Sequence, residues 1–124
     1  MDNLELKPLE YKNECGDLHR PWQEGPALVW KDGSTFYYEH GELHRPWQEG
    51  PAVIWANGHL AYFEQGVRHR PHQDGPAVIY PDGYLVYIEQ GKWNRPVSEG
   101  PARVWADGTQ EFWENGTFQR KVEP

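Results

Sequence analysis

Histidine and arginine stand next to each other at three points of this chain, 25 residues apart. The pairs are His19-Arg20, His44-Arg45 and His69-Arg70, and the arginine alone recurs as Arg95 and Arg120. An imidazole can transfer a proton or ligate a metal ion, and a guanidinium binds carboxylates and phosphates through paired hydrogen bonds. The repeated pair therefore suggests either an anion-binding row or a set of structural ion pairs.

Carboxylates recur at the same interval. One row follows the arginines and comprises Glu24, Glu49, Asp74 and Glu99. A second row comprises Glu14, Glu39, Glu64, Glu89 and Glu114. Because the carboxylates match the arginines one for one, we expect each arginine to bridge carboxylates of its own or the next repeat. The alternative is an arginine row that binds a nucleotide or another small anion through the His–Arg pairs.

The histidines offer a metal site only within one loop. A metal ion needs its ligands within about 2–2.5 Å, whereas repeats two strands apart lie about 10 Å from each other, so histidines of different repeats do not share an ion. His69, His72 and Asp74 form an H-x-x-H-x-D group with suitable spacing. Asn94 and Gln119 replace the histidine in the last two copies and keep its hydrogen bonding. We therefore expect structural histidines and predict no metal or cofactor.

Large aromatic side chains occupy a loop that has proline at both ends. Trp22 and Trp47 stand in the segment PWQEGP, and His72 and Val97 hold the same phase in later copies. Rigid aromatic side chains are frequent anchors of protein interfaces, although these residues can equally cover the hairpin below them. We take Trp22, Trp47 and His72 as candidate partner-binding residues, together with the His–Arg pairs of the second and third copies.

The sequence contains no arrangement typical of a catalytic site. Ser34 and Ser98 lack a nucleophile elbow and recognisable triad partners, and Cys15 has no adjacent histidine. Glycine loops of the types GxxxxGK and GxGxxG are absent. We therefore expect a protein that is not an enzyme. The alternative is a site between repeats in which a perturbed histidine or cysteine faces a cleft.

The residues described so far belong to a longer internal repeat. The decapeptide LHRPWQEGPA occurs at 18–27 and again at 43–52, and weaker copies run through 69–77 and 94–102. The phase is set by glycines 25 residues apart, which are Gly16, Gly41, Gly66, Gly91 and Gly116. We assign a single domain with an N-terminal cap and half repeat at 1–15, repeats at 16–40, 41–65, 66–90 and 91–115, and a C-terminal cap at 116–124.

Each repeat predicts a β-hairpin. In the third repeat the β-branched and aromatic runs AVIY and YLVYIE flank the turn PDG, and the other copies have KDG, ANG and ADG there. A three-residue loop with glycine in the left-handed position fixes the register. The expected pairs are Leu28 with Phe36, Val53 with Ala61, Val78 with Val86 and Arg103 with Glu111. The last pair is polar in both members and opposite in charge, as a directly opposed pair permits.

A second turn follows each hairpin, at His40-Gly41, Gln65-Gly66, Gln90-Gly91 and Asn115-Gly116. We expect two-residue turns that place the histidines opposite Tyr37, Tyr62 and Tyr87, and then a short third strand before the proline loop. The fold prediction is all-β, with four 25-residue β-hairpin repeats stacked into an elongated, twisted antiparallel array.

Strand parity places two further groups of large side chains on one face. The first group directly precedes the hairpin turns and comprises Trp30, Trp55, Tyr80 and Trp105. The second group comprises Tyr38, Phe63, Ile88 and Trp113. We expect both groups to form the core between repeats. The residues before the turns are in addition candidates for contact with a partner.

Glycine-phased hairpin repeats of this length resemble MORN-type repeats. The likeness is greatest to a divergent MORN-like variety with the pattern HR..(D/E)GPA(V/I)I..DG, here His44-Arg45, 49–54 and Asn57-Gly58, with counterparts in each repeat. It extends over about residues 14–120. The resemblance implies a scaffold or binding module of the kind found in bacterial, phage and large-virus proteins, and an inhibitor or immunity-type partner is one such role.

Charge and composition restrict the partners. The 124 residues carry a formal net charge of −7, which argues against a nonspecific grip on nucleic acid and against docking on anionic lipid. A single cysteine, Cys15, cannot form an internal disulfide, so a reducing cytoplasm is the expected compartment. No signal peptide and no apolar run of membrane-spanning length is seen.

These observations predict a non-enzymatic, acidic protein-binding module. It is expected to bind another protein through a rigid aromatic and acidic surface of the repeats. Two alternatives stay open: a binder of a small anionic ligand or nucleotide, and a scaffold that self-associates into a homo-oligomer through an open sheet edge.

Overall fold

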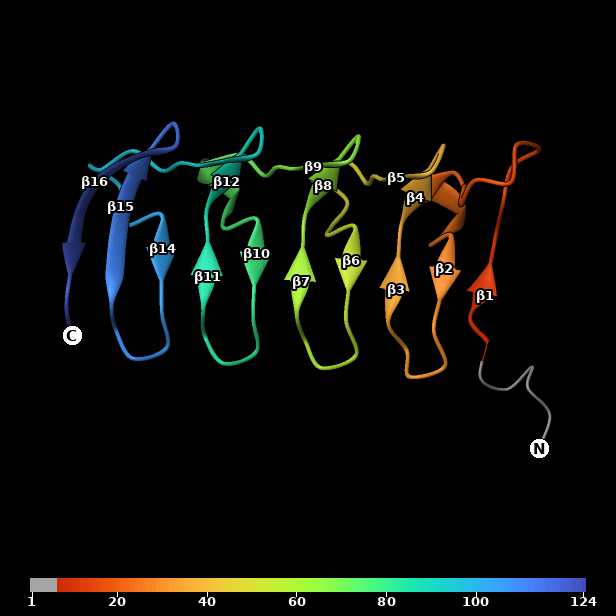
Figure 1. Ribbon diagram of the computed structural model, residues 1–124, viewed down its shortest axis with the longest axis horizontal. Helices are drawn as coiled ribbons and strands as arrows, with labels where there is room; N and C mark the ends of the chain where they lie inside the picture. Colours follow the sequence, from red (N-terminus) through yellow and green to blue (C-terminus); the bar gives the residue numbers. More distant parts are fainter. Residues whose placement is uncertain (1–6) are drawn as a thin grey trace.

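The fold is dominated by one extended sheet built from repeated hairpins (Figure 1). A computed structural model of the protein describes residues 7–124, so the part of the N-terminal cap before residue 7 lies outside the described residues. Ten antiparallel strands follow the order β1-β2-β3-β6-β7-β10-β11-β14-β15-β16. The predicted all-β array of stacked hairpins is confirmed.

The strands are short. The large sheet consists of β1 (Leu9–Glu10), β2 (Leu28–Val29), β3 (Thr35–Phe36), β6 (Val53–Ile54), β7 (Leu60–Ala61), β10 (Val78–Ile79), β11 (Leu85–Val86), β14 (Arg103–Val104), β15 (Gln110–Glu114) and β16 (Thr117–Val122). Three two-stranded sheets join β4 (Tyr38–Glu39) to β5 (Glu42–Leu43), β8 (Phe63–Glu64) to β9 (Val67–Arg68), and β12 (Ile88–Glu89) to β13 (Lys92–Trp93). The proline loops hold the single-turn 3₁₀ helices η2 (Trp22–Glu24) and η3 (His72–Asp74).

The hairpin register agrees with the sequence in all four repeats. The structure pairs Leu28 with Phe36, Val53 with Ala61, Val78 with Val86 and Arg103 with Glu111. The hairpin turns use glycine with positive φ, for example +96° at Gly33, as a left-handed turn position requires. Neighbouring hairpins are joined edge to edge, because β3 pairs with β6, β7 with β10 and β11 with β14.

The second turns have two central residues with positive φ. His40 has φ of 52° and Gly41 has 78°, and the three later copies repeat these values closely. Such turns match the right-handed twist of paired strands. They place the histidine opposite the tyrosine as expected, since the amide of His44 donates to the carbonyl of Tyr37 at 2.9 Å.

The N-terminal half repeat is present but shifted by one residue. Strand β1 pairs with β2 as β3 pairs with β6, and the amide of Asn13 donates to the carbonyl of Asp17 at 2.9 Å. The turn between them therefore has three residues instead of two. Asn13, not Glu14, holds the position of Glu39, so the placement of Glu14 in the second carboxylate row is wrong.

The core is a thin layer between the large sheet and the small hairpins. Buried residues include the alanines of the GPA motif, Ala27, Ala52, Ala77 and Ala102, each with 0% exposure. Around the centre of the sheet, Phe36, Val53, Val78 and Ile88 form the main cluster, and Tyr38 and Phe63 pack against it. The second group of large side chains thus includes core residues, as expected.

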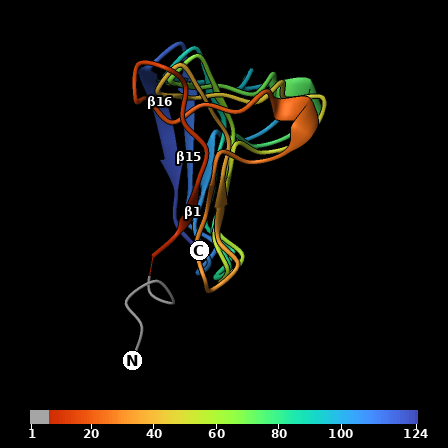
Figure 2. The same ribbon diagram turned by 90° about the vertical axis from the view of Figure 1, so that its right-hand side faces the viewer.

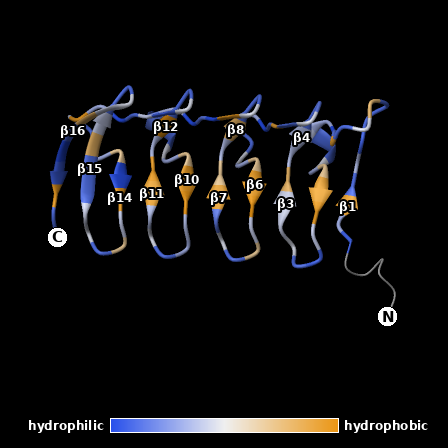
Figure 3. Cartoon of the chain, in the orientation of Figure 1, coloured by the Kyte–Doolittle hydropathy of each residue, from blue (hydrophilic) through white to orange (hydrophobic). Residues whose placement is uncertain are grey.

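The large sheet forms the length of the molecule. Figure 2 shows it from one end, with the 3₁₀ turns projecting to one side of its upper part. Apolar residues concentrate in the central strands, and the turns are hydrophilic (Figure 3). Within residues 7–124, no helix is long and apolar enough to cross a membrane.

Candidate functional site

The repeated arginines Arg20, Arg45, Arg70 and Arg95 are bound inside their own loops. In Arg45 the Nη1 atom donates to the carbonyl of Pro51 at 3.1 Å, and the guanidinium lies 4.2 Å from the ring centroid of Tyr37. Arg20, Arg70 and Arg95 repeat both contacts. No ion pair of these arginines occurs within residues 7–124. The expectation that they bridge carboxylates is therefore wrong.

A glycine closes each arginine site from the other side. A Cβ atom at Gly50 would lie 2.7 Å from Nη1 of Arg45, and the φ of Gly50 is +136°. The same approach recurs at Gly25, Gly75 and Gly100. A tyrosine ring faces one side of the guanidinium and the glycine backbone faces the other. This arrangement explains why arginine and the GPA motif occur together, and it leaves the guanidinium little room to hold an external anion.

The histidines of the His–Arg pairs each connect one second turn to the next, within a single repeat. Nδ1 of His44 accepts the amide hydrogen of Gln65 at 3.0 Å, and His19 and His69 do the same for His40 and Gln90. Asn94 replaces the imidazole with its amide oxygen and accepts from Asn115 at 2.8 Å. A neutral imidazole that accepts at Nδ1 carries its proton on Nε2, so these rings are held in one tautomer.

The second carboxylate row anchors the proline loops. Oε1 of Glu39 accepts the amide hydrogen of Trp22 at 3.1 Å, and Glu64, Glu89 and Glu114 hold the corresponding amides of the later loops. Each carboxylate, at the end of a repeat, thus binds the proline loop at the start of the same repeat. These residues stabilise the stack and are not a set of paired catalytic acids.

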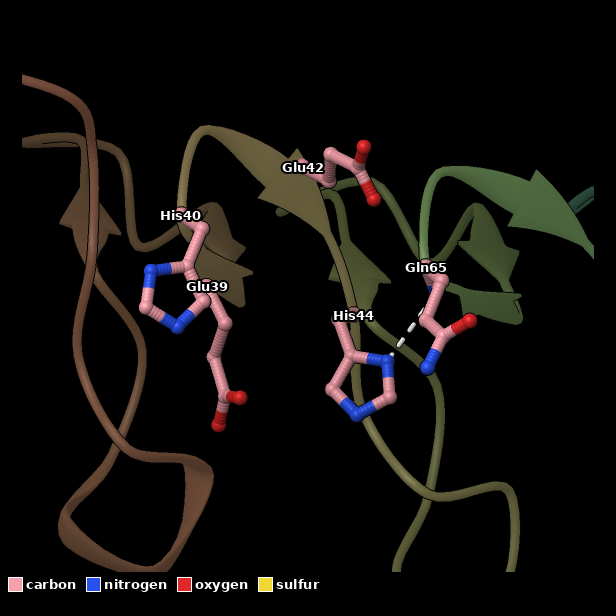
Figure 4. A pocket seen from close by; sticks show the side chains of 5 residues that line it. All are labelled: Glu39, His40, Glu42, His44 and Gln65. Carbon is pink, nitrogen blue, oxygen red and sulfur yellow. Dashed lines mark hydrogen bonds between the residues drawn. The ribbon is translucent and has the colours of Figure 1, made fainter.

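A small groove lies between the second turns of neighbouring repeats (Figure 4). Its volume is about 270 Å³, and its lining residues are Glu39, His40, Glu42, His44 and Gln65. A related groove recurs one repeat later with Val67 and His69 in place of Glu42 and His44. Glu39 and His44 already make the hydrogen bonds described above. The groove therefore follows from the repeat geometry, and these two side chains have structural roles.

The predicted loop residues are only partly exposed. Trp47 packs against the main core cluster, and Trp22 is half-buried. His72 lies between two carboxylates, with Nδ1 2.5 Å from Oε1 of Glu89 and Nε2 3.0 Å from Oε2 of Glu99. Of the two alternatives for the loop tryptophans, covering the hairpin describes Trp47 better than presenting a free contact surface.

The H-x-x-H-x-D spacing does not assemble a metal site. His69 uses Nδ1 to accept from Gln90, whereas both nitrogens of His72 face glutamates. Among residues 7–124 there is no group of three or more His, Cys, Asp or Glu side chains that could hold a metal ion.

Aromatic side chains line one face of the large sheet. The exposed fractions are 42% for Trp30, 41% for Trp55 and 37% for Tyr80. The expectation that these three residues form the core is wrong, because the face on which they stand has no second layer at this height. Their alternative role as exposed contact residues agrees with the structure. Trp105, the fourth residue of that group, is half-buried. We call Trp30, Trp55, His59, Tyr80, Tyr84 and Trp105 the aromatic row.

From Trp55 to Trp105, the rings of this row contact one another from repeat to repeat. His59 stacks on Tyr80 at 4.1 Å between centroids and lies 6.3 Å from Trp55. Tyr84 lies 5.4 Å from Tyr80 and 5.2 Å from Trp105. Burial lowers the pKa of His59 below its ordinary value, and the positive charge of Arg68 lowers it further. His59 is therefore a neutral aromatic ring at neutral pH.

A hollow adjoins the middle of the aromatic row. It has a volume of about 240 Å³ and extends from Trp55 and His59 to Tyr38, Phe63 and Arg68. At the C-terminal end of the same face, Arg103 lies 4.0 Å from the ring centroid of Trp93 and 4.5 Å from that of Trp105. This face thus combines exposed aromatic rings with a few cationic groups.

Sequence reasoning missed His59 and Tyr84. A signal was present, since both stand directly after the hairpin turn, opposite Trp55 and Tyr80. The alternation of side chains along a strand places His59 and Tyr84 on the same sheet face as Trp55 and Tyr80. It does not say whether other residues cover that face.

Comparison of the chain with protein-family models, curated proteins and solved structures finds no match. The site is therefore interpreted from its geometry.

Proposed function

We propose that this chain is a non-enzymatic module that binds another protein through the aromatic row. The observation that carries this proposal is the row of aromatic rings on a sheet face without a covering layer, in which Trp30, Trp55 and Tyr80 are exposed and ring contacts run from Trp55 to Trp105. Large exposed aromatic side chains on a rigid scaffold are typical anchors of protein interfaces. Because the rings from Trp55 to Trp105 already contact one another, few of their rotamers would be lost on binding.

The alternative of a small-anion binder has less support. The groups that would hold the anion are the guanidiniums of the His–Arg pairs. They already donate to proline carbonyls and stack on tyrosine rings. The formal net charge of −7 also repels an anion at long range. A basic or neutral protein surface suits the molecule better.

The test compares two variants that remove aromatic rings from different surfaces. Tagged wild type, a Trp30→Ala/Trp55→Ala variant and a Trp22→Ala/Trp47→Ala variant are used for affinity capture from a lysate of the source organism, after circular dichroism has established that each is folded. A captured protein is then purified, and its Kd for all three chains is measured.

We expect the row variant to lose at least about tenfold in affinity, as removal of interface anchors does, and the loop variant to stay close to wild type. Equal affinity of the row variant and wild type would refute the aromatic row as the binding surface. An inhibitor or immunity-type role would in addition require that the wild-type chain lowers the activity of the captured protein.

A further inference from the structure

The aromatic row has one gap, and the gap lies in the first repeat. Position 59 is histidine and position 84 is tyrosine, but the corresponding residue of the first hairpin is Ser34. Ser34 is fully buried, and its Oγ accepts the amide hydrogen of Ala56 at 2.9 Å. Position 34 therefore supplies no ring between the two flanking tryptophans, Trp30 and Trp55. The ring of Phe36, two residues later in β3, contacts Trp55 edge to face with 5.0 Å between centroids.

The structure leaves an open slot at this place. Trp30, Lys31, Asp32 and Trp55 line a volume of about 340 Å³. Within residues 7–124, Trp30 makes no ring contact, whereas Trp55, Tyr80 and Trp105 all do. Trp30 and Trp55 are also the two most exposed rings of the row.

The width of the slot follows from the sheet. Trp30 and Trp55 extend strands separated by one other strand, so their rings stand about 9–10 Å apart. A planar group needs about 3.5–4 Å of stacking distance on each side, so one planar group fits. His59 and Tyr84 fill the corresponding gaps of the second and third repeats with one ring each.

Two observations favour a guanidinium as the planar group. Arg103 already lies between two tryptophan rings of the same face, 4.0 Å from Trp93 and 4.5 Å from Trp105. The slot contains the carboxylate of Asp32, whose Oδ1 also accepts the amide hydrogen of Ser34 at 2.8 Å, beside the ammonium group of Lys31, and the whole chain carries a net charge of −7. Tryptophan is also the aromatic side chain that attracts cations most strongly.

We infer that the Trp30–Trp55 slot binds an arginine side chain of a basic segment in the partner protein. This inference rests on the proposed function and specifies its anchor. The guanidinium would take the place that the imidazole of His59 occupies in the next repeat, with an indole on each face and the carboxylate of Asp32 near the opening.

The test uses a short peptide as the probe. Acetyl-Gly-Arg-Gly-amide is titrated into the full chain, and the indole N–H signals of Trp30 and Trp55 are followed by NMR. We expect saturable shifts of these two signals with a Kd of about 1 mM, as an isolated anchor gives. The citrulline peptide has the same planar shape without charge, and the tyrosine peptide offers a ring; both should bind at least about threefold more weakly.

Variants based on the repeat itself close and open the slot. Ser34→Tyr places a ring in the first repeat at the position that Tyr84 holds in the third, and it should abolish the shifts of the Trp30 and Trp55 signals. Trp30→Leu removes one wall without touching buried Ser34 and should weaken binding about tenfold, which keeps the test decisive if Ser34→Tyr does not fold. His59→Ser should create a second slot, seen as new peptide-induced shifts of the Tyr80 ring.

Unchanged binding to folded Ser34→Tyr or Trp30→Leu would overturn the inference. So would a citrulline or tyrosine peptide that binds as tightly as the arginine peptide, or a folded His59→Ser without a second site.

The peptide experiment needs no natural partner. If the slot binds the arginine peptide but the row variant keeps full affinity for a captured protein, the proposed function is refuted and the slot is not. If the row variant loses affinity but the slot does not bind the arginine peptide, the slot is refuted and the proposed function is not.

Discussion

At the scale of single residues, the repeated sequence is explained by one side-chain cluster. Arginine, tyrosine, proline and glycine meet in each loop, so the motif is kept because four groups contact one another. The Nε atoms of Arg45, Arg70 and Arg95 are buried without a protein partner. The cluster therefore relies on stacking and on a single hydrogen bond for much of its stability.

The glycine of this cluster provides the first stability test. We expect Gly50→Ala to lower the free energy of unfolding by about 2–3 kcal/mol, since the new Cβ would collide with Nη1 of Arg45 and the backbone would be strained. Gly33→Ala is the matched control, because Gly33 also has positive φ but nothing within 4 Å of an added Cβ; it should cost about 1 kcal/mol. Equal losses in urea denaturation would show that the guanidinium contact is unimportant.

His59 makes the stability of the row depend on pH. Its pKa is lowered in the folded chain from the ordinary value of 6.5, so the unfolded chain binds more protons between the two pKa values. Stability is therefore fully present above pH 6.5 and falls as the pH drops through the folded-state pKa.

The variant His59→Tyr, which copies Tyr84, should remove this part of the pH dependence. Thermal unfolding of both chains between about pH 5 and 8 measures it. The Tm of the wild type should fall more steeply on acidification than that of His59→Tyr. Parallel Tm profiles would mean that His59 titrates alike in the folded and unfolded chains.

At the scale of elements, side-chain hydrogen bonds connect each second turn to the next one along the array. His44→Ala removes the acceptor for the amide of Gln65 and should cost about 1 kcal/mol. His44→Asn should stay within about 0.5 kcal/mol of wild type, because Asn94 serves the same purpose in the fourth repeat. Chemical denaturation distinguishes the two, and an equal loss in both variants would contradict the role of the side-chain acceptor.

The elements also show what the sequence could predict. The pairing of Leu28 with Phe36 was predictable because loop length and glycine position determine register. The arginine environment was not, since it depends on Tyr37 and Gly50 meeting across strand and loop. The exposure of Trp55 was not predictable either, because parity assigns a face without saying what covers it. The position of Glu14 was not predictable from the 25-residue period, because the period does not reveal that the first turn has one extra residue.

At the scale of the whole molecule, the chain is a linear array in which each hairpin contacts only its neighbours. The strand order follows the chain from β1 at one end to β16 at the other (Figure 1). In such arrays, stability is approximately a sum over repeats and their interfaces. The six-residue strand β16, with Arg120 and Lys121, closes the C-terminal end, and charged side chains discourage further strand addition.

Removal of one complete repeat tests this description. Deletion of 41–65 joins His40 to Gly66, which restores the second turn and brings Phe36 opposite Val78 in the place of Ala61. The shortened chain should fold cooperatively, with a denaturant m-value lower by about a fifth. It should also keep an arginine slot, now between Trp30 and Tyr80 above Ser34. Deletion of 41–52 alone breaks the phase and should destabilise the chain more, because β4 loses its partner β5 and the shortened connection no longer lets β3 pair with β6. If both deletions unfolded the chain alike, the repeats would not be interchangeable units, and the slot would depend on its particular neighbours rather than on its position in the array.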